Sequence, residues 1–351
     1  MENKDTVCII GLGFVGLTLA ITLCDVGVNV FGIESNEATY KSLSASIPHF
    51  YEPKLEILLR KALESGKLTI KQELPHGLTA SIYIVTVGTP LNEFGRARLD
   101  IVELATHQIA ESAPSQSLVI LRSTCKLGTT SKIVKPILNS SGKHFDLAFC
   151  PERTVEGQAL QELRYLPQII GGVDSIATNR SVELFTKITP NIVNVSSPEV
   201  AEMIKMVDNT YRDICFGFSN EVAMACDLNG INAHEVIMSG RDGYKRSNHL
   251  YMPGPVGGPC LSKDPHIFSQ CFEDSQFSLD ITKAARTTNE FVPSFTIDII
   301  SKYFTKVGLS DFANSPLKIS ILGLAFKGKP ETNDLRGSTS LLFIETFKQT
   351  F

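Results

Sequence analysis

A loop rich in glycine and proline leads to Cys260, the residue of this chain best suited to nucleophilic chemistry. The loop reads Pro253-Gly254-Pro255-Val256-Gly257-Gly258-Pro259-Cys260, and Lys263 and Asp264 follow at the start of an apparent helix. A cysteine near a helix N-terminus and a lysine has surroundings that favour the reactive thiolate. The glycines could let a bulky ligand approach the backbone. The alternative is a structural loop with an incidental cysteine.

A second group of polar residues recurs at helical spacing in the middle of the chain. Lys205, Asn209 and Arg212 are separated by four and three residues, so they share one face of a helix. Such a stripe is ordinarily solvated. The apolar runs 214–218 and 222–226 that follow predict a mostly buried helix, in which two cations need anionic or polar partners. We therefore expect a binding or catalytic site on this face.

A glycine motif near the N-terminus predicts a dinucleotide site. Gly11-Leu12-Gly13-Phe14-Val15-Gly16 follows an apolar strand and opens a helix. Gly11 would make the tight turn, Gly13 would let the backbone approach a pyrophosphate, and Gly16 would let the helix pack closely. Glu34 ends the next strand, where a carboxylate binds the ribose hydroxyls, which favours NAD over NADP. The alternative is a glycine-rich turn followed by a surface glutamate.

The elements that position these residues form an alternation of strands and helices in the first half of the chain. The predicted strands are 7–10, 28–33, 82–87, 118–121, 147–150, 168–171 and 192–195. Helical stretches such as 14–26 and 129–138 lie between them. This pattern predicts a doubly wound parallel sheet of Rossmann type over residues 1–196.

The pattern changes to helices after residue 196. A long helix is predicted over 198–228 and another near 276–304, which together indicate a helical middle domain over 197–305. A strand at 317–322 and a helix at 338–351 then begin a second alternation. One strand and one helix cannot bury a core. Either these elements dock on the rest of the chain, or residues 306–351 are the incomplete beginning of a further Rossmann-like domain, and we expect the second.

Composition and charge exclude several classes of protein. The 351 residues are 43% hydrophobic and 20% charged, with a net charge of −4. Because the chain has no excess of basic residues, we expect no nucleic-acid partner. No signal peptide or apolar run of membrane-spanning length is evident, and we expect a cytoplasmic protein without a membrane partner. The eight cysteines show no metal-binding spacing, so no metal is expected.

Taken together, the motifs resemble the UDP-glucose/GDP-mannose dehydrogenase family over essentially the whole chain. Besides the glycine motif, the 205–209 helix and the Cys260 loop, the resemblance rests on Val87-Gly88-Thr89-Pro90, Ser123-Thr124, Cys150-Pro151-Glu152-Arg153-Thr154-Val155-Glu156-Gly157, Gly323-Leu324-Ala325-Phe326-Lys327 and Asp334-Leu335-Arg336-Gly337-Ser338. Within the family the chain is similar to the UDP-N-acetylmannosamine and UDP-N-acetylglucosamine 6-dehydrogenases. The residues that indicate this branch are Cys150 to Arg153, Tyr211-Arg212-Asp213, and Arg246-Ser247-Asn248, with Met206 where the glucose branch usually has tyrosine.

The resemblance implies a four-electron oxidation of a UDP-sugar alcohol at C6, in the synthesis of surface polysaccharide precursors. Cys260 would hold the aldehyde as a thiohemiacetal and then as a thioester, which water releases as the acid. Lys205 and Asn209 would stabilise the oxyanion. Asp264 would position Lys205 or water, and Glu152 would transfer protons.

The resemblance also assigns binding residues, a homodimer and NAD as the cofactor. The cofactor-binding residues would be Gly11, Gly13, Phe14, Val15, Gly16, Glu34, Thr89, Thr124, Glu156, Lys263 and Arg336. The substrate-binding residues would be Arg153, Thr154, Val155, Arg212, Arg246, Asn248, Gly257, Phe326 and Lys327. The dimer would form through the long middle helix.

This sequence departs from the family pattern at a few positions. Glu34 replaces the usual aspartate, Cys125-Lys126 stands where Val-Pro is common, and Pro255 replaces a frequent glycine. None of these changes removes a catalytic group. The resemblance implies a complete third domain, and we expect this sequence to contain only its beginning.

Other functions remain as alternatives. Within the family, the substrate could be UDP-glucose or GDP-mannose. A two-electron hydroxyacid dehydrogenase would share the Rossmann and helical domains but has no use for the loop cysteine. A truncated, inactive NAD-binding homologue would keep the motifs without the chemistry.

Overall fold

The computed structural model describes residues 6–75, 77–273, 275–308 and 318–350. Contacts divide the chain into two units, Met1–Met206 with Lys329–Thr332, and Val207–Gly328 with Asn333–Phe351. Each unit is described by itself below. The sequence-based domain boundaries at 196/197 and 305/306 stay predictions.

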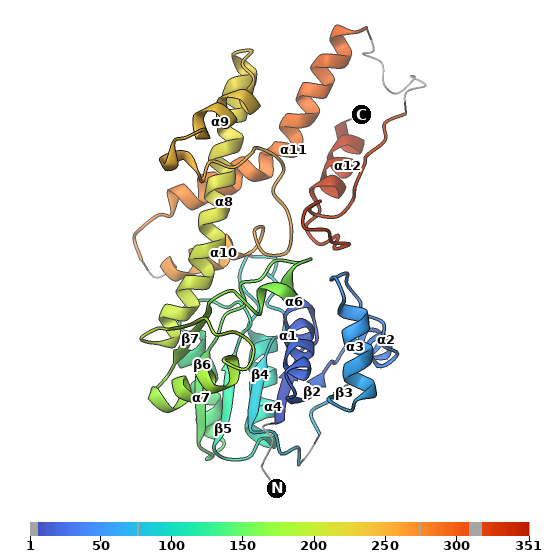
Figure 1. Cartoon of the computed structure of the whole chain (residues 1–351). Helices are drawn as coiled ribbons and strands as arrows, with labels where there is room; N and C mark the ends of the chain where they lie inside the picture. Colours follow the sequence, from blue (N-terminus) through green and yellow to red (C-terminus); the bar gives the residue numbers. More distant parts are fainter. Residues whose placement is uncertain (1–5, 76, 274, 309–317, 351) are drawn as a thin grey trace. The chain divides into compact units, whose positions relative to one another are not determined.

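The first unit is built on one eight-stranded sheet (Figure 1). Its strands are β1 (Thr6–Ile10), β2 (Asn29–Ile33), β3 (Leu68–Lys71), β4 (Ile82–Val85), β5 (Ser117–Leu121), β6 (Phe145–Phe149), β7 (Gln168–Gly172) and β8 (Ile192–Asn194). Their order in the sheet is β3-β2-β1-β4-β5-β6-β7-β8. This confirms the predicted doubly wound architecture and all seven predicted strands.

Two features of the sheet differ from the sequence-based prediction. The sheet is not parallel throughout, because β7 pairs antiparallel with β6. β3 was not predicted: its sequence Leu-Thr-Ile-Lys has only two apolar residues, and they alone are buried. β3 is an edge strand with a polar outer face, so it lacks the continuous apolar run that marks the central strands.

Helices cover both faces of the sheet. The helices of this unit are α1 (Phe14–Asp25), α2 (Glu37–Ser44), α3 (Leu55–Glu64), α4 (Asp100–Ser112), the π-helix η1 (Thr130–Val134), α5 (Lys135–Ser140), α6 (Ala159–Glu162) and α7 (Ser175–Phe185). Along β1, Val7 and Ile9 belong to one hydrophobic core, while Cys8 and Ile10 belong to a second. α1, α3 and α7 bury residues in the first core, and α4 and α5 in the second, so alternate strand residues face opposite helical layers.

The long helix α8 (Pro198–Leu228) has the bounds predicted from sequence. Its first two turns belong to the first unit, where Ala201 enters the second hydrophobic core. The remainder belongs to the second unit, together with α9 (Ala233–Arg241), η2 (Lys245–Ser247), α10 (Asp264–Ser269), η3 (Gln270–Phe272), α11 (Asp280–Lys306) and α12 (Thr339–Thr350). The second unit is thus helical in the residues described, as predicted for the middle of the chain.

The last predicted strand is not formed in the described residues. Residue 317 lies outside them, and residues 318–322 have no strand pairing. Leu322 is 93% exposed, because no neighbouring strand in the described chain covers it. The helix predicted after it is present as α12.

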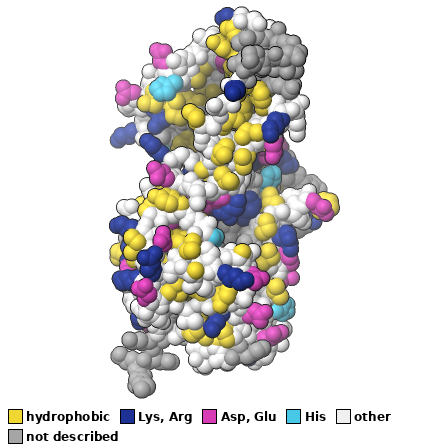
Figure 2. All heavy atoms as spheres, turned by 90° about the vertical axis from the view of Figure 1, so that its right-hand side faces the viewer, with side chains coloured by type: hydrophobic (Ala, Val, Ile, Leu, Met, Phe, Trp, Pro, Cys, Tyr) yellow, Lys and Arg dark blue, Asp and Glu magenta, His cyan; other side chains and the backbone are white. Residues whose placement is uncertain are grey.

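The described helices include none that is both long and apolar enough to cross a membrane. On the face drawn in Figure 2, hydrophobic side chains lie among charged side chains of both signs. No single sign of charge dominates that face.

Candidate active site

The glycine motif forms the turn between β1 and α1, as its spacing predicts. Gly11 has a φ of +92°, which favours glycine. A Cβ on Gly16 would lie 1.9 Å from the carbonyl oxygen of Gly11, so Gly16 lets α1 start against the turn itself. Gly13 precedes α1 and has open space where its Cβ would be. The turn therefore leaves room for a phosphate at the N-terminus of α1, where backbone N–H groups favour an anion.

Glu34 is held beside this turn at the end of β2. One carboxylate oxygen accepts the N–H of Leu12 at 3.0 Å, and the other accepts the N–H of Asn36 at 2.9 Å. The carboxylate is therefore fixed next to the glycine motif. This is where a ribose bound in the turn would present its hydroxyls.

Thr89 and Thr124, predicted from separate motifs to bind the cofactor, come together in the structure. The Thr89 hydroxyl donates to the Thr124 carbonyl at 2.5 Å. Nearby, Thr86 donates its hydroxyl to the carbonyls of Ile10 and Gly11. The ends of β1, β4 and β5 are thus joined by threonine side chains on the side of the sheet where the glycine turn lies.

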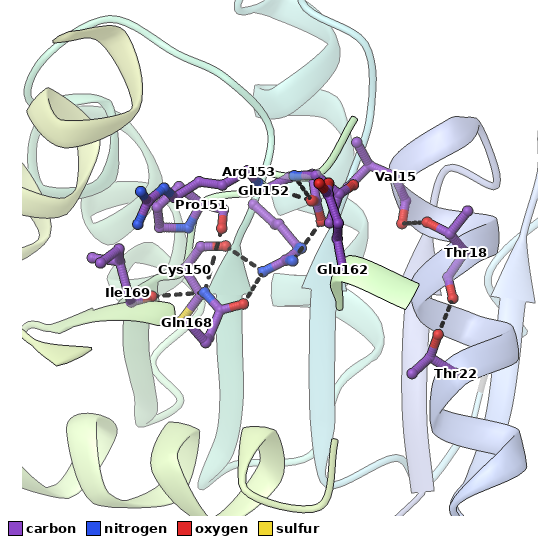
Figure 3. Close-up of polar contacts among 12 residues, drawn as sticks. Val15, Thr18, Thr22, Cys150, Pro151, Glu152, Arg153, Glu162, Gln168 and Ile169 are labelled. Carbon is purple, nitrogen blue, oxygen red and sulfur yellow. Dashed lines mark hydrogen bonds and ion pairs between the residues drawn. The ribbon is translucent and has the colours of Figure 1, made fainter. Parts of the chain in front are cut away.

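Glu152 is buried and already bound by the protein through both oxygens (Figure 3). Arg122 Nη2 lies 2.5 Å from Oε2. Oε1 accepts the backbone N–H groups of Arg153 at 2.8 Å and Thr154 at 2.6 Å. Burial alone would raise the pKa of Glu152, but the charge of Arg122, hydrogen bonds from Thr154 and the charge of Lys205 hold it below its ordinary value of 4.5. Glu152 is therefore a carboxylate at neutral pH.

Arg122 was not predicted from sequence, although it organises this part of the site. It is 3% exposed, and its Nη1 donates to the carbonyl of Cys150 and the side chain of Gln168, both at 2.9 Å. Gln168 in turn donates to the carbonyls of Pro151 and Ile169. The only sequence signal was a charged residue directly after the apolar run of β5, and the sequence does not show its distant partner.

The rest of the 151–157 loop is held by other carboxylates. Glu162 accepts the N–H of Val155 at 2.7 Å, and buried Glu52 accepts that of Gly157 at 2.7 Å. Glu156, a predicted cofactor residue, accepts from the hydroxyl of Thr332 at 3.1 Å. The loop that carries five predicted site residues is therefore fixed along its length.

On α8 the polar stripe is only partly buried. Asn209 is 7% exposed and Lys205 is half-buried, but Arg212 is exposed. The expectation that both cations of the stripe are buried is therefore wrong for Arg212, which lies beside the exposed Tyr211 on a part of α8 that faces solvent. Asn209 donates its amide to Asp264 Oδ2 at 2.6 Å, which brings together two predicted catalytic residues from separate segments.

Cys260 lies exposed in a turn that leads into α10. Its carbonyl accepts the N–H groups of Lys263 at 3.1 Å and Asp264 at 2.8 Å. Lys263 Nζ lies 3.5 Å from Asp264 Oδ1, so the lysine charge faces the buried carboxylate. α10 has only six residues, which makes its dipole a weak influence on the thiol.

The glycines before Cys260 accommodate the chain itself. A Cβ on Gly257 would lie 2.2 Å from the Gly337 carbonyl oxygen, and one on Gly258 would lie 2.5 Å from the Phe326 ring. The N–H of Gly258 also donates to the Gly337 carbonyl at 3.0 Å. Residues 326–337 therefore fill the space that a Cβ on Gly257 or Gly258 would take, so the packing of the chain itself requires glycine at both positions. Contact of Gly257 with a substrate stays a prediction.

The remaining predicted residues of the second unit make local contacts. Lys327 Nζ lies 5.5 Å from the Phe326 ring centroid, and Arg336 forms an ion pair with Asp334 at 2.6 Å. Arg246, in η2, lies 5.6 Å from the ring of Tyr244, and Asn248 follows η2 directly. The predicted catalytic residues Glu152 and Lys205 belong to the first unit, and Asn209, Cys260 and Asp264 belong to the second.

Comparison with known proteins adds independent findings. The NAD-binding domain model of the UDP-glucose/GDP-mannose dehydrogenase family matches residues 5–189, and its central domain model matches residues 199–291. A UDP-N-acetyl-D-mannosamine dehydrogenase of Pyrococcus horikoshii is 30% identical over 98% of this chain and 81% of its own length. The Escherichia coli K12 protein with the same name is 31% identical over 98% of this chain and 83% of its own length.

Solved structures of the same family also resemble this chain. The structure of the UDP-D-ManNAc dehydrogenase of Pyrococcus horikoshii matches with a TM-score of 0.90 and 30% identity, over 98% of this chain and 81% of that one. A UDP-glucose dehydrogenase from Pyrobaculum islandicum matches with a TM-score of 0.85 and 26% identity, over 99% of this chain and 81% of that one. The fold is therefore similar to that of dehydrogenases with different sugar substrates.

The position of Glu34 predicts the choice of nicotinamide cofactor. A 2′-phosphate would meet the Glu34 carboxylate, and a like-charge contact of this kind costs several kcal/mol. We expect NADH to bind at least about 100-fold more tightly than NADPH. Glu34→Gln keeps an oxygen for Leu12 but removes the charge, and it should narrow this ratio about tenfold or more. Fluorescence titration with both nucleotides measures the two dissociation constants.

Glu37→Gln is the matched control. Glu37 lies three residues away, pairs with Lys41 and is exposed, so the ratio should stay as in the unmodified protein. Equal affinities for NADH and NADPH before any substitution would contradict the assignment of Glu34.

Proposed function

The chain belongs to the UDP-glucose/GDP-mannose dehydrogenase family, and from this we propose that it oxidises C6 of a UDP-N-acetylhexosamine to the carboxylate through a covalent intermediate on Cys260. That it is an NAD-dependent UDP-sugar dehydrogenase follows from the family models and the relatives. The covalent mechanism is supported above all by the exposed Cys260, which lies in sequence just before Asp264, the partner of Asn209. N-acetylmannosamine or N-acetylglucosamine is the proposed sugar.

The residues of the first unit fit NAD. The glycine turn would hold the pyrophosphate, Glu34 would bind the ribose hydroxyls, and Thr89, Thr124 and Glu156 would bind the rest of the cofactor. Lys263 and Arg336 are also proposed as cofactor residues, from the family resemblance. Bound NAD supplies the acceptor for the hydride that C6 loses in each oxidation. The open space at Gly13 and the fixed carboxylate of Glu34 support this assignment.

Cys260 would act between the two oxidations. The first oxidation removes a hydride and a proton from the C6 alcohol and leaves an aldehyde. The Cys260 sulfur then forms a bond to C6, and the aldehyde oxygen takes a proton, which gives a thiohemiacetal. Loss of a second hydride and that proton gives a thioester. Water adds to C6, the C–S bond breaks, and the acid and the thiol are released.

The neighbouring residues would serve the oxygen on C6 and the protons. Lys205 and the Asn209 amide would stabilise the oxyanion as it develops. Asp264 accepts from Asn209, which supports a role in orienting that amide, and it could also position Lys205 or water. Glu152 is ionised, so it would accept a proton from the attacking water rather than donate one.

The substrate residues are proposed from the family resemblance. Arg153, Thr154 and Val155 lie in the loop fixed by Glu152 and Glu162. In the second unit, the proposed contacts are Arg212, Arg246, Asn248, Gly257, Phe326 and Lys327. Arg212 and Arg246 carry the preference for an N-acetylhexosamine, and the exposure of Arg212 leaves it accessible to a ligand.

We also propose a homodimer formed through α8. Val207, Tyr211 and Phe218 are 44%, 47% and 58% exposed, and helical spacing places them on one face of α8. Light scattering should give twice the mass of the chain, and a monomeric mass at micromolar concentration would contradict the proposal.

We also propose a cytoplasmic role in supplying uronates for surface polysaccharide. All eight cysteines are thiols, as expected in a reducing compartment. The acid form of a UDP-N-acetylhexosamine is a building block that a glycosyltransferase reaction would consume.

The stoichiometry of the reaction and the choice of sugar test the proposal together. The protein is assayed at the NADH absorbance with UDP-N-acetylmannosamine, UDP-N-acetylglucosamine, UDP-glucose and GDP-mannose. We expect two NADH per sugar, no free aldehyde, and the highest kcat/KM for one of the two N-acetylhexosamines. A higher kcat/KM for UDP-glucose or GDP-mannose would assign the alternative substrate, and no turnover with any of them would favour an inactive homologue.

Substitution of Cys260 tests the covalent mechanism. Cys260→Ala should lose acid formation by about three orders of magnitude or more, because no side chain then holds the aldehyde for the second oxidation. NAD binding should be unchanged. In Cys260→Ser an ester that hydrolyses slowly should accumulate and be visible in the intact mass. Cys271→Ala, a half-buried cysteine eleven residues later, serves as the control.

The covalent mechanism fails if Cys260→Ala makes acid at a rate close to that of the unmodified protein. A ratio of one NADH per sugar at completion would also exclude it.

The ion pair of Glu152 predicts a pH effect. Arg122→Met removes the cation that lowers the pKa of Glu152 but leaves the carboxyl buried, so the pKa should rise. Because Glu152 acts as a carboxylate, the acid limb of the kcat profile should move to higher pH. Arg122→Lys keeps a positive charge and should leave the limb nearer its original position. The pH dependence of NADH formation measures both variants, and superimposable limbs for Arg122→Met and the unmodified protein would exclude Glu152 as the titrating base.

A further inference from the structure

A buried polar network joins α8 to α11 in the second unit, and none of the roles above uses it. The α8–α11 network consists of Asp213, Asn220, Arg286 and Asn289, each 5% exposed or less. Asp213 Oδ1 accepts from Arg286 Nη1 at 2.6 Å and from Asn289 Nδ2 at 2.9 Å. Asn289 Oδ1 accepts from Asn220 Nδ2 at 2.9 Å. The four side chains therefore form one connected chain of hydrogen bonds.

Both ends of this network bind the loop that carries Cys260. Arg286 Nη1 donates to the carbonyl of Leu261, the residue directly after Cys260, at 2.9 Å. Asn220 Oδ1 accepts the N–H of Gly254 at 2.8 Å. The segment between these two contacts, residues 254–261, is the cysteine loop. The network thus holds the cysteine loop at its beginning and at its end.

The two helices approach closely at the centre of the network. A Cβ on Gly217 would lie 2.9 Å from both the Cα and the Cβ of Ala285. Gly217 lies between Asp213 and Asn220 on α8, and Ala285 precedes Arg286 on α11. The backbone contact fixes the spacing of the helices, so the side chains on either side of it reach the loop from a rigid base.

Stability alone does not account for the network. Burial raises the pKa of Asp213 to about 6; Arg286 and Asn289 oppose this rise, and Glu290 adds to it. A carboxyl whose pKa rises on folding binds its proton more tightly in the folded state, so it favours folding at low pH, and this contribution is lost as the pH rises through about 6. Asp213 Oδ2 has no hydrogen-bond partner among the described residues. A buried pair that is incompletely bonded adds little to stability and fits a role in fixing geometry.

We propose that the α8–α11 network is a set of positioning residues that fixes the cysteine loop, and through it the place of the Cys260 thiol. The inference rests on the proposed function of Cys260. The network touches neither substrate nor cofactor in this proposal. It acts through the backbone of the loop, at the Gly254 N–H and at the Leu261 carbonyl.

Asn220→Ala is the principal test, because it removes one anchor and leaves the Asp213–Arg286 ion pair intact. Amide hydrogen exchange is followed in peptides that cover 253–262, and kcat and KM are measured with the UDP-sugar panel. We expect exchange in the cysteine loop to accelerate about tenfold or more. We expect kcat to fall about 10- to 100-fold, as for a small misplacement of a reacting group, while the NADH dissociation constant stays within about twofold.

Glu221→Ala is the matched control. Glu221 is next to Asn220 on α8, is exposed, and accepts from Thr288 of α11 at 3.3 Å; among the described residues it makes no hydrogen bond to the cysteine loop. Its loss should change neither exchange in the loop nor kcat. An equal effect of both variants would overturn the proposal, because it would show that general helix contact is sufficient.

A second pair of variants tests the other anchor. Arg286 binds Asp213 and Leu261 through the same nitrogen, so the single ammonium of Arg286→Lys can supply both bonds. Arg286→Lys should therefore retain most of the exchange protection and kcat that Arg286→Leu loses. Equal losses of exchange protection and kcat in Arg286→Lys and Arg286→Leu would overturn the proposal. So would an unchanged rate of hydrogen exchange in the loop of Asn220→Ala.

Exchange in the loop is measured without turnover. If Cys260→Ala still forms acid, the covalent mechanism fails, whereas the loop protection in Asn220→Ala and Arg286→Leu still shows whether the network anchors the loop. If hydrogen exchange in the loop accelerates but kcat stays within about twofold of that of the Glu221→Ala control, the network does not act on catalysis through the loop.

Discussion

A polar side chain that leaves water must find a hydrogen-bond partner, and along α8 these partners are the loops that carry the site. Glu202 accepts two N–H groups and a hydroxyl from the segment 128–130. Asn209 binds Asp264, and Asp213 and Asn220 reach the cysteine loop through the α8–α11 network. The buried polar positions of one helix therefore determine where several irregular segments lie. An apolar helix of the same length could pack equally well, but it would leave these segments without anchors.

Carboxylates play the same part in the first unit. Glu34, Glu52, Glu152 and Glu162 each accept backbone N–H groups of segments that have no regular hydrogen-bonding pattern. A charge-assisted bond of this kind is shorter and stronger than one between neutral groups. It also affects the carboxylate, because two N–H groups and Arg122 keep Glu152 ionised in spite of its burial. The contacts that shape the 151–157 loop thereby set the protonation state of the proposed base.

Much of this arrangement could be predicted from local patterns, and the exceptions have physical causes. The central strands are continuous apolar runs, so they were evident, whereas β3 has a polar outer face and was missed. The strand β7 was predicted but its antiparallel direction was not, because the direction of a strand depends on the connection and not on its composition. Residues 318–322 form no strand, although the apolar pattern predicts one, since a strand exists only when a neighbour accepts its hydrogen bonds. Gly257 and Gly258 were expected to admit a ligand, but chain segments far away in the sequence fill the space that a Cβ would take there.

The sequence by itself determined the glycine turn, the long helix α8 and the residue types available for chemistry, because each of these depends on spacing within a short segment. It also determined the family, through motifs that are specific when taken together. Only the tertiary structure decided that Arg122 binds Glu152, that Asn209 binds Asp264, and that Arg286 reaches the backbone after Cys260. These pairs are separated by 30, 55 and 25 residues, and no local pattern records which partner a buried charge or amide will meet. Partners at such separations are chosen by how the elements pack, since a buried polar group is tolerated only where packing brings a complementary group within hydrogen-bonding distance.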